Sequence, residues 1–113
     1  MTGVQTCALP ISGIALDRPI LAEAVVVLGP VPVIPFSKPS TEELARDVAG
    51  AVAGANAVLM ANHGALAVGE TVIQAWERME TLEQLARVSL VARILGRETT
   101  LPAESVARLL GRP

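Results

Sequence analysis

Residues 57–69, AVLMANHGALAVG, decide the fold of this 113-residue chain. Residues 57–61 are apolar, and because a run of five is too short for a helix they predict a buried strand. Asn62, His63 and Gly64 follow as a turn, and a second short strand is expected over residues 65–68. The stretch therefore predicts two short strands joined by a turn that carries the one histidine of the chain.

A helix is predicted immediately before this stretch. Ser40 to Glu43 has the form of a capping box, in which the Ser40 hydroxyl accepts the Glu43 amide and the Glu43 carboxylate returns to Ser40. The helix is expected to begin at about Thr41 and to end at Gly54. Its buried stripe is expected to contain two apolar rows with a spacing of four: Leu44, Val48 and Val52, with Ala45, Ala49 and Ala53 beside them.

A longer helix is predicted after the stretch. Thr71 and Gln74 form another cap, the helical pattern runs from Val72 to Leu95, and Gly96 supplies the C-terminal stop. The residues expected on its buried face are Ala75, Met79, Leu82, Ala86, Leu90 and Ile94.

The flanking segments complete an α/β pattern. Residues 20–28 are a candidate for a short apolar helix, and Pro102 begins a last helix at a position that needs no N–H. Residues 31–34 are expected to be extended because Pro32 and Pro35 push their predecessors into the β region, and so many prolines confine a segment to a sheet edge or a loop. The order helix, strand, helix, strand, turn, strand, helix predicts an α/β fold with an incomplete sheet.

Composition restricts the class of protein. The length is that of one domain, and 51% apolar against 18% charged residues excludes a disordered chain. A net charge of −2, the lack of a Lys/Arg cluster and only two aromatic residues argue against a nucleic-acid surface. Residues 48–69 are uncharged over the length of a membrane span, but they include three polar side chains and change periodicity, so no membrane helix is predicted.

Residues 1–11, MTGVQTCALPI, are set apart from the rest. They match the in-frame translation of a common sequencing adapter, so we interpret them as non-native. Cys7 then has no biological role, and because one cysteine cannot form an internal disulfide, a cytoplasmic location is predicted. On this interpretation residues 12–113 are the C-terminal part of a single domain.

His63 is the candidate functional residue. Histidine is both the commonest metal ligand and an acid–base group at neutral pH, and His63 follows a buried strand, where α/β proteins present functional groups. A zinc site needs three or four donors, whereas residues 12–113 hold no cysteine and no second histidine. Neither a Gly-x-Ser-x-Gly elbow nor a glycine-rich phosphate loop occurs. Any active site must therefore be completed by residues outside this chain, and a structural role for His63 stays open.

Three segments, in the right order and at the right spacing around this turn, carry a resemblance to a known family. Residues 60–69, MANHGALAVG, are followed by residues 76–83, WERMETLE, and preceded by residues 31–44, VPVIPFSKPSTEEL. Together they resemble the class II aldolase/adducin family, whose best-known enzymes are L-fuculose-phosphate aldolase and L-ribulose-5-phosphate 4-epimerase. Residues 31–44 are similar to the family's Pro-Tyr-x-x-x-Gly-Thr-x-Glu-Leu segment. The resemblance extends from Ser12 to about Leu110.

The resemblance implies a three-layer α/β/α sheet of the class II aldolase type, of which this chain holds an incomplete part. It assigns His63 as the last of three imidazole ligands of a divalent cation, usually Zn²⁺, and it assigns no catalytic residue to this chain. The other two histidines, the glutamate that acts as ligand or acid/base, and the phosphate-binding loops precede Ser12 in the family's order. They are expected outside this chain.

The implied activity is that of a zinc-dependent aldehyde-lyase of carbohydrate and pentose catabolism. The cation would stabilise the enediolate left when a sugar phosphate such as L-fuculose 1-phosphate is cleaved, and the fragment alone is expected to be inactive. The family also implies a homo-oligomer, a tetramer. Three alternatives stay open: epimerisation or dehydration of a sugar phosphate, a non-catalytic adducin-like assembly module, and a free-standing interaction domain with a structural His63.

Phe36 departs from the family's pattern. It stands where aldolases of this type carry a tyrosine that reaches an adjacent subunit's active site as a proton donor. Phenylalanine cannot donate a proton, which weighs against fuculose-phosphate cleavage, and we interpret Phe36 as a core or interface aromatic. Ser40 replaces the family's glycine in the same segment, a change compatible with the capping role predicted above.

Overall fold

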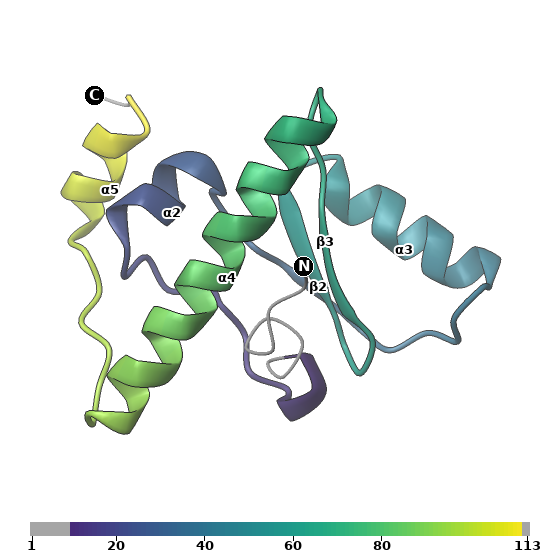
Figure 1. Cartoon of the computed structure of the whole chain (residues 1–113), viewed down its shortest axis with the longest axis horizontal. Coiled ribbons are helices and arrows are strands. Elements are labelled where there is room, and N and C mark those ends of the chain that lie inside the picture. The colour runs from purple at the N-terminus through teal and green to yellow at the C-terminus, as the bar shows by residue number, and fades with distance from the viewer. Residues whose placement is uncertain (1–9, 112–113) are drawn as a thin grey trace.

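A short β-sheet lies between helices in the structure, a computed structural model that describes residues 10–111 (Figure 1). In chain order the elements are α2 (Ala22–Val27), β1 (Val33–Ile34), α3 (Glu42–Val52), β2 (Ala57–Met60), β3 (Gly64–Ala67), α4 (Val72–Ile94) and α5 (Ala103–Leu109). This is the predicted order. The interpretation of residues 1–11 as non-native falls mostly on residues 1–9, outside the described part, and stays a prediction.

The sheet has the strand order β1-β2-β3. Strand β1 runs parallel to β2, with Ile34 opposite Met60, and β2 and β3 form an antiparallel hairpin in which Met60 faces Gly64. Within residues 10–111 β1 pairs with β2 alone, and the Pro32 carbonyl accepts the Leu59 amide at 2.9 Å. The proline-rich segment therefore lies at an edge of this sheet, as predicted.

Helices cover both faces of the sheet and give the predicted three-layer α/β/α arrangement (Figure 1). Ala57 and Leu59 of β2 join Leu82 and Ala86 of α4 in one apolar core. Val58 points to the opposite face because side chains alternate along a strand, and it is also fully buried, on the side where α3 contacts β1 and β2. Burial on both faces explains why the whole of β2 is apolar.

The long helix α4 begins as predicted. The Thr71 hydroxyl accepts the Gln74 amide at 3.0 Å, and the Gln74 side chain accepts the Glu70 amide at 2.7 Å. The predicted buried face holds as far as Ala86 and then fails, because Leu90 and Ile94 are 42% and 74% exposed. In the last turns the buried face includes Ser89 instead.

Helix α3 is capped one residue later than predicted. The Thr41 hydroxyl, not that of Ser40, accepts an amide of the first turn, from Leu44 at 3.3 Å. Ser40 has a φ of 63°, so it occupies the left-handed position for which glycine is the ordinary residue. The predicted capping role of Ser40 is therefore wrong. The left-handed backbone at this position explains why a glycine is suited to it in the family's pattern.

The predicted buried stripe of α3 is only partly formed. Leu44, Val48 and Val52 are half-buried. Ala45, Ala49 and Ala53, predicted to be buried beside them, are exposed. Among the described elements helix α3 packs mainly against β1 and β2, and much of its surface is open.

The uncharged run from residue 48 to residue 69 is divided among α3, β2 and β3. Within residues 10–111 no helix combines the length and the apolar character that crossing a membrane requires.

Candidate functional site

His63 lies in the tight turn of the β2–β3 hairpin, at the carboxyl end of a buried strand, as predicted. Its amide donates to the Met60 carbonyl at 3.0 Å, and Met60 in turn pairs with Gly64 across the hairpin. The His63 side chain is exposed. A rigid backbone therefore presents an accessible imidazole at the edge of the sheet.

Asn62 makes the sharp turn of the backbone. Its φ is 56°, in the left-handed region that asparagine tolerates better than most residues, and its amide donates to the Pro10 carbonyl at 3.1 Å. Gly64 has no positive φ and is simply the first, buried residue of β3. The sequence predicted the sharp turn at Gly64, whereas the structure places the left-handed residue at Asn62.

The end of β1 lies beside this turn. Because β1 and β2 are parallel, the chain leaves both strands at the same edge, and the Ala61 amide donates to the Ile34 carbonyl at 3.0 Å. Phe36 follows two residues after Ile34 and is 60% exposed, so it is not a core aromatic of this chain. The next residue, Ser37, is buried and its hydroxyl donates to Asp47 of α3 at 3.1 Å, which fixes the segment.

His63 brings an imidazole, a common metal ligand, to this edge of the sheet. Among the residues that the structure describes, no group of three or more His, Cys, Asp or Glu side chains could hold an ion. Cys7 lies outside the described part. Imidazole is a donor that zinc accepts, but a protein zinc site uses three or four, so the described residues alone do not build one.

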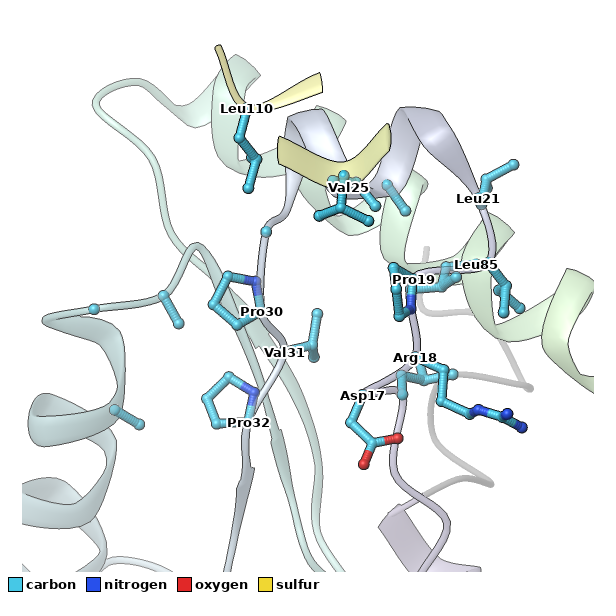
Figure 2. A pocket seen from close by; sticks show the side chains of 18 of the residues that line it. Asp17, Arg18, Pro19, Leu21, Val25, Pro30, Val31, Pro32, Leu85 and Leu110 are labelled. Atoms are coloured by element: carbon cyan, nitrogen blue, oxygen red, sulfur yellow. The ribbon is translucent and has the colours of Figure 1, made fainter. Parts of the chain in front are cut away.

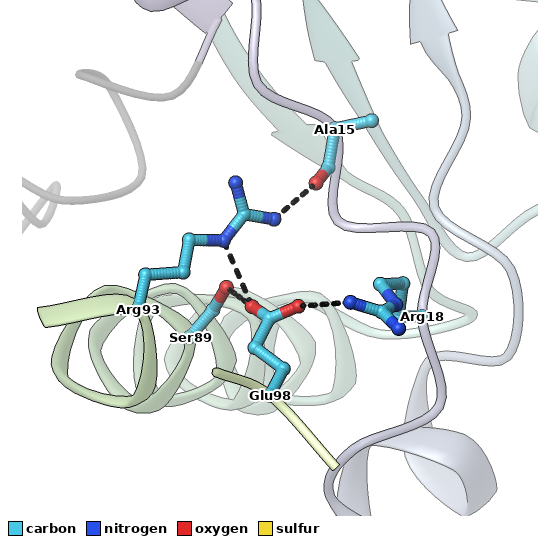
Figure 3. A network of polar contacts seen from close by, with 5 residues as sticks. All are labelled: Ala15, Arg18, Ser89, Arg93 and Glu98. Atoms are coloured by element: carbon cyan, nitrogen blue, oxygen red, sulfur yellow. Dashed lines mark hydrogen bonds and ion pairs between the residues drawn. The ribbon is translucent and has the colours of Figure 1, made fainter. Parts of the chain in front are cut away.

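A buried carboxylate that sequence analysis missed lies elsewhere, after α4 (Figure 3). Glu98 accepts hydrogen bonds from Ser89 and, at 2.9 Å, from Arg93, and it pairs with Arg18 at 3.5 Å. Burial acts to raise the pKa of Glu98, but the hydrogen bonds from Ser89 and Arg93 and the charges of Arg93 and Arg18 outweigh it and hold that pKa below its usual value. With every oxygen engaged by its own chain, Glu98 is a structural group.

A large apolar cavity in the described part of the chain is also far from His63. It lies at the amino ends of β1 and β2 (Figure 2). His63, in contrast, follows the carboxyl end of β2. Its volume is about 650 Å³ and its walls are mostly aliphatic. The imidazole and the cavity therefore belong to opposite ends of the sheet.

Comparisons with known proteins place these features in a family. The sequence profile "Class II Aldolase and Adducin N-terminal domain" matches residues 4–90. The 3-oxo-tetronate 4-phosphate decarboxylase of Escherichia coli K12 is 35% identical over 74 residues, which are 66% of this chain and 35% of that protein.

Two solved structures extend the similarity to nearly the whole chain. An L-fuculose 1-phosphate aldolase superposes with a TM-score of 0.87 at 28% identity, over 97% of this chain and 51% of its own. YgbL from Escherichia coli superposes with a TM-score of 0.83 at 31% identity, over 96% of this chain and 54% of its own. The chain thus spans about a third of the curated relative and about half of each solved structure.

Proposed function

Because the chain belongs to the class II aldolase and adducin family, we propose that the whole protein is a metal-dependent lyase that breaks a carbon–carbon bond of a phosphorylated sugar or sugar acid. The observation that carries the proposal is His63, an exposed imidazole at the carboxyl end of a buried strand inside the matched region. The similarity of the chain to an aldolase and to a decarboxylase supports carbon–carbon cleavage as the shared chemistry.

His63 is proposed as one ligand of a divalent cation, Zn²⁺ being the first candidate. The hairpin turn suits this role because its hydrogen bonds hold the backbone of a ligand that must point away from the sheet. The other protein donors are proposed to come from the half of the domain that this chain lacks. When bound, the cation acts as a Lewis acid on a substrate oxygen.

Phe36 favours loss of CO₂ over aldol cleavage. Aldol cleavage forms an aldehyde, so a group must take the proton of the carbinol hydroxyl, or return it in the reverse direction. Loss of CO₂ from a 3-oxo acid breaks the bond to the carboxylate, and its electron pair is delocalised onto the neighbouring ketone oxygen before a proton adds to carbon. No hydroxyl proton has to move, so this reaction does not need a proton-donating side chain at the exposed position of Phe36.

Zinc-dependent aldol cleavage of a sugar phosphate is the second candidate, supported by the superposition on L-fuculose 1-phosphate aldolase. Under either candidate we propose a cytoplasmic homo-oligomer of carbohydrate metabolism, a tetramer by analogy with the family. The exposed Phe36 supports this because a large aromatic side chain in water is typical of a subunit contact.

The test uses the intact protein, with the upstream half of the domain in place. Bound metal is measured by mass spectrometry in the wild type, in His63→Ala and in Gln84→Ala, a control at an exposed position of α4. We expect His63→Ala to lower bound metal at least about tenfold and the control to retain it. Full metal content in His63→Ala would refute the ligand role.

The reaction is tested with two substrates, 3-oxo-tetronate 4-phosphate and L-fuculose 1-phosphate. We expect the wild type to release CO₂ from the first, and Phe36→Tyr to leave this release within about threefold. Efficient aldehyde release from the second, unchanged by the Phe36 substitution, would overturn the preference for decarboxylation.

A further inference from the structure

Phe36 is an exposed aromatic residue held between two restrained neighbours. Its side chain is 60% exposed, whereas Ile34 before it is buried in β1 and Ser37 after it is only 6% exposed. Pro35 has a fixed φ because of its ring. The buried Ser37 hydroxyl donates to the Asp47 carboxylate of α3 at 3.1 Å. The backbone therefore holds the aromatic ring in water at a defined place.

The hydrogen bond between Ser37 and Asp47 is the attachment next to this ring. A second attachment lies at the start of α3, where the Thr41 hydroxyl donates to the Lys38 carbonyl at 2.6 Å. A hydrogen bond from a hydroxyl to a carboxylate is stronger than one between neutral groups, and a buried hydroxyl without a partner is costly. Loss of either side chain of the pair should therefore free the segment that carries the ring.

The ring lies at the same edge of the sheet as the His63 imidazole. The Ala61 amide donates to the Ile34 carbonyl at 3.0 Å, so the ends of β1 and β2 are adjacent. His63 lies in the turn that follows β2 and Phe36 two residues beyond β1, and both side chains are exposed. A substrate that reaches a cation on His63 therefore meets the end of β1 as well.

We infer that Ser37 and Asp47 are positioning residues of the proposed lyase, which hold the Phe36 ring as an apolar wall beside the substrate. The inference rests on the proposed function, because it takes loss of CO₂ to occur at the His63 edge. In that step the bond to the carboxylate carbon breaks, CO₂ leaves, and the electron pair moves onto the ketone oxygen before a proton adds to carbon. Water stabilises the compact carboxylate charge more than the dispersed charge of the transition state, so a fixed apolar ring that excludes water lowers the barrier.

The first test measures kcat and KM for CO₂ release from 3-oxo-tetronate 4-phosphate in the intact protein. Ser37→Ala removes the donor, Asp47→Ala removes the acceptor, and Asp47→Asn keeps an acceptor oxygen. We expect Ser37→Ala and Asp47→Ala to lower kcat about tenfold with KM within about threefold, because a misplaced ring affects the transition state. Asp47→Asn should restore kcat, and Ser40→Ala, at an exposed position of the same loop, is the matched control.

A double-mutant cycle separates positioning from a merely structural role. Phe36→Ala should lower kcat to a similar extent as Ser37→Ala. The variant that combines both should be no slower than Phe36→Ala alone, because Ser37 acts through the ring. Additive losses would overturn the inference.

The second test needs no substrate. Phe36 is the single phenylalanine of the 113-residue chain, so 4-fluorophenylalanine gives one ¹⁹F resonance. We expect Ser37→Ala to lower the transverse relaxation rate of this fluorine at least about twofold, because a released ring moves on the picosecond to nanosecond timescale. Asp47→Asn should leave the rate unchanged, and an unchanged rate in Ser37→Ala would overturn the inference. A wild type that releases no CO₂ would refute the proposed reaction, while the relaxation rates would still decide whether the pair holds the ring.

Discussion

The hairpin side of the molecule, formed by β2, β3 and α4, contrasts with the groove side, formed by α2, α3, α5 and the segment before β1. On the hairpin side Leu59 and Leu82 are fully buried, and Arg78 donates to the Val68 carbonyl at 2.6 Å, which ties α4 to the end of β3. On the groove side a cavity of about 650 Å³ separates the helices. Both sides share one apolar core, which joins Leu28 to Leu59 and Leu82, but the helices of the groove side leave an apolar space between them.

Truncation of one aliphatic side chain on each side should give the largest difference in stability between the two sides. We expect Leu82→Ala to lower the free energy of unfolding by about 2–5 kcal/mol, because it leaves a void in a closed core. Val106→Ala, at the wall of the open cavity, should cost less than about 1 kcal/mol, since little packing is lost there. Chemical denaturation of both variants measures the difference, and equal losses would mean that the groove side is as well packed as the core.

The features that could be predicted from the sequence are those that depend on neighbouring residues. The strands, the hairpin turn and the start of α4 were predicted because each depends on residues within about four positions, such as Thr71 and Gln74. Leu90 and Ile94 were predicted to be buried and are not. Whether the last turns of a helix are covered depends on segments distant in sequence, and a single-chain periodicity carries no information about them.

The addition of one methyl group should change stability in opposite directions on the two sides. A Cβ at Gly69 would lie 2.7 Å from the Ala75 amide nitrogen, so we expect Gly69→Ala to cost about 1–3 kcal/mol. Gly50→Ala meets open space and should raise stability by about 0.8–1 kcal/mol through helix propensity. Thermal unfolding followed by circular dichroism decides this, and a gain at Gly69 would contradict the close packing of that turn.

Only one residue of the candidate site, His63, was predicted from the sequence. The position of His63 follows from a short apolar run that ends in Asn-His-Gly, a local signal. A complete metal site cannot be predicted in this way, because its donors come from segments that meet only in the folded domain. Glu98 illustrates the point: it pairs with Arg18, 80 residues earlier, and nothing in the local sequence of either residue indicates the pair.

Glu98 joins the two sides, since Ser89 and Arg93 belong to α4 and Arg18 lies in the segment before α2. We expect Glu98→Gln to lower stability at pH 7 by about 1–2 kcal/mol, because hydrogen bonds to a charged group are lost. The pKa of Glu98 is lowered in the folded chain from an ordinary 4.5, so its stabilisation is present above that value and is lost as the pH falls through the lower, folded pKa.

The stability difference between the wild type and Glu98→Gln should therefore be constant from pH 7 to about 5 and shrink below about 4.5. Urea denaturation at a series of pH values measures it, and comparison with the variant removes the contribution of the other carboxylates. A difference that grows on acidification would show that the carboxyl is protonated in the folded chain at neutral pH.

The smallest expected effect compares the two left-handed residues, Ser40 on the groove side and Asn62 on the hairpin side. A serine at φ 63° is strained by its Cβ, and glycine removes the strain while it raises the entropy of the unfolded chain, so Ser40→Gly should gain about 0.5 kcal/mol. Asn62→Gly should gain less, because asparagine tolerates this conformation. Ser40→Ala, the control, keeps a Cβ and should gain nothing. If Ser40→Ala stabilised the chain as much as Ser40→Gly, the serine hydroxyl rather than the backbone angle would be the source of strain at the start of α3.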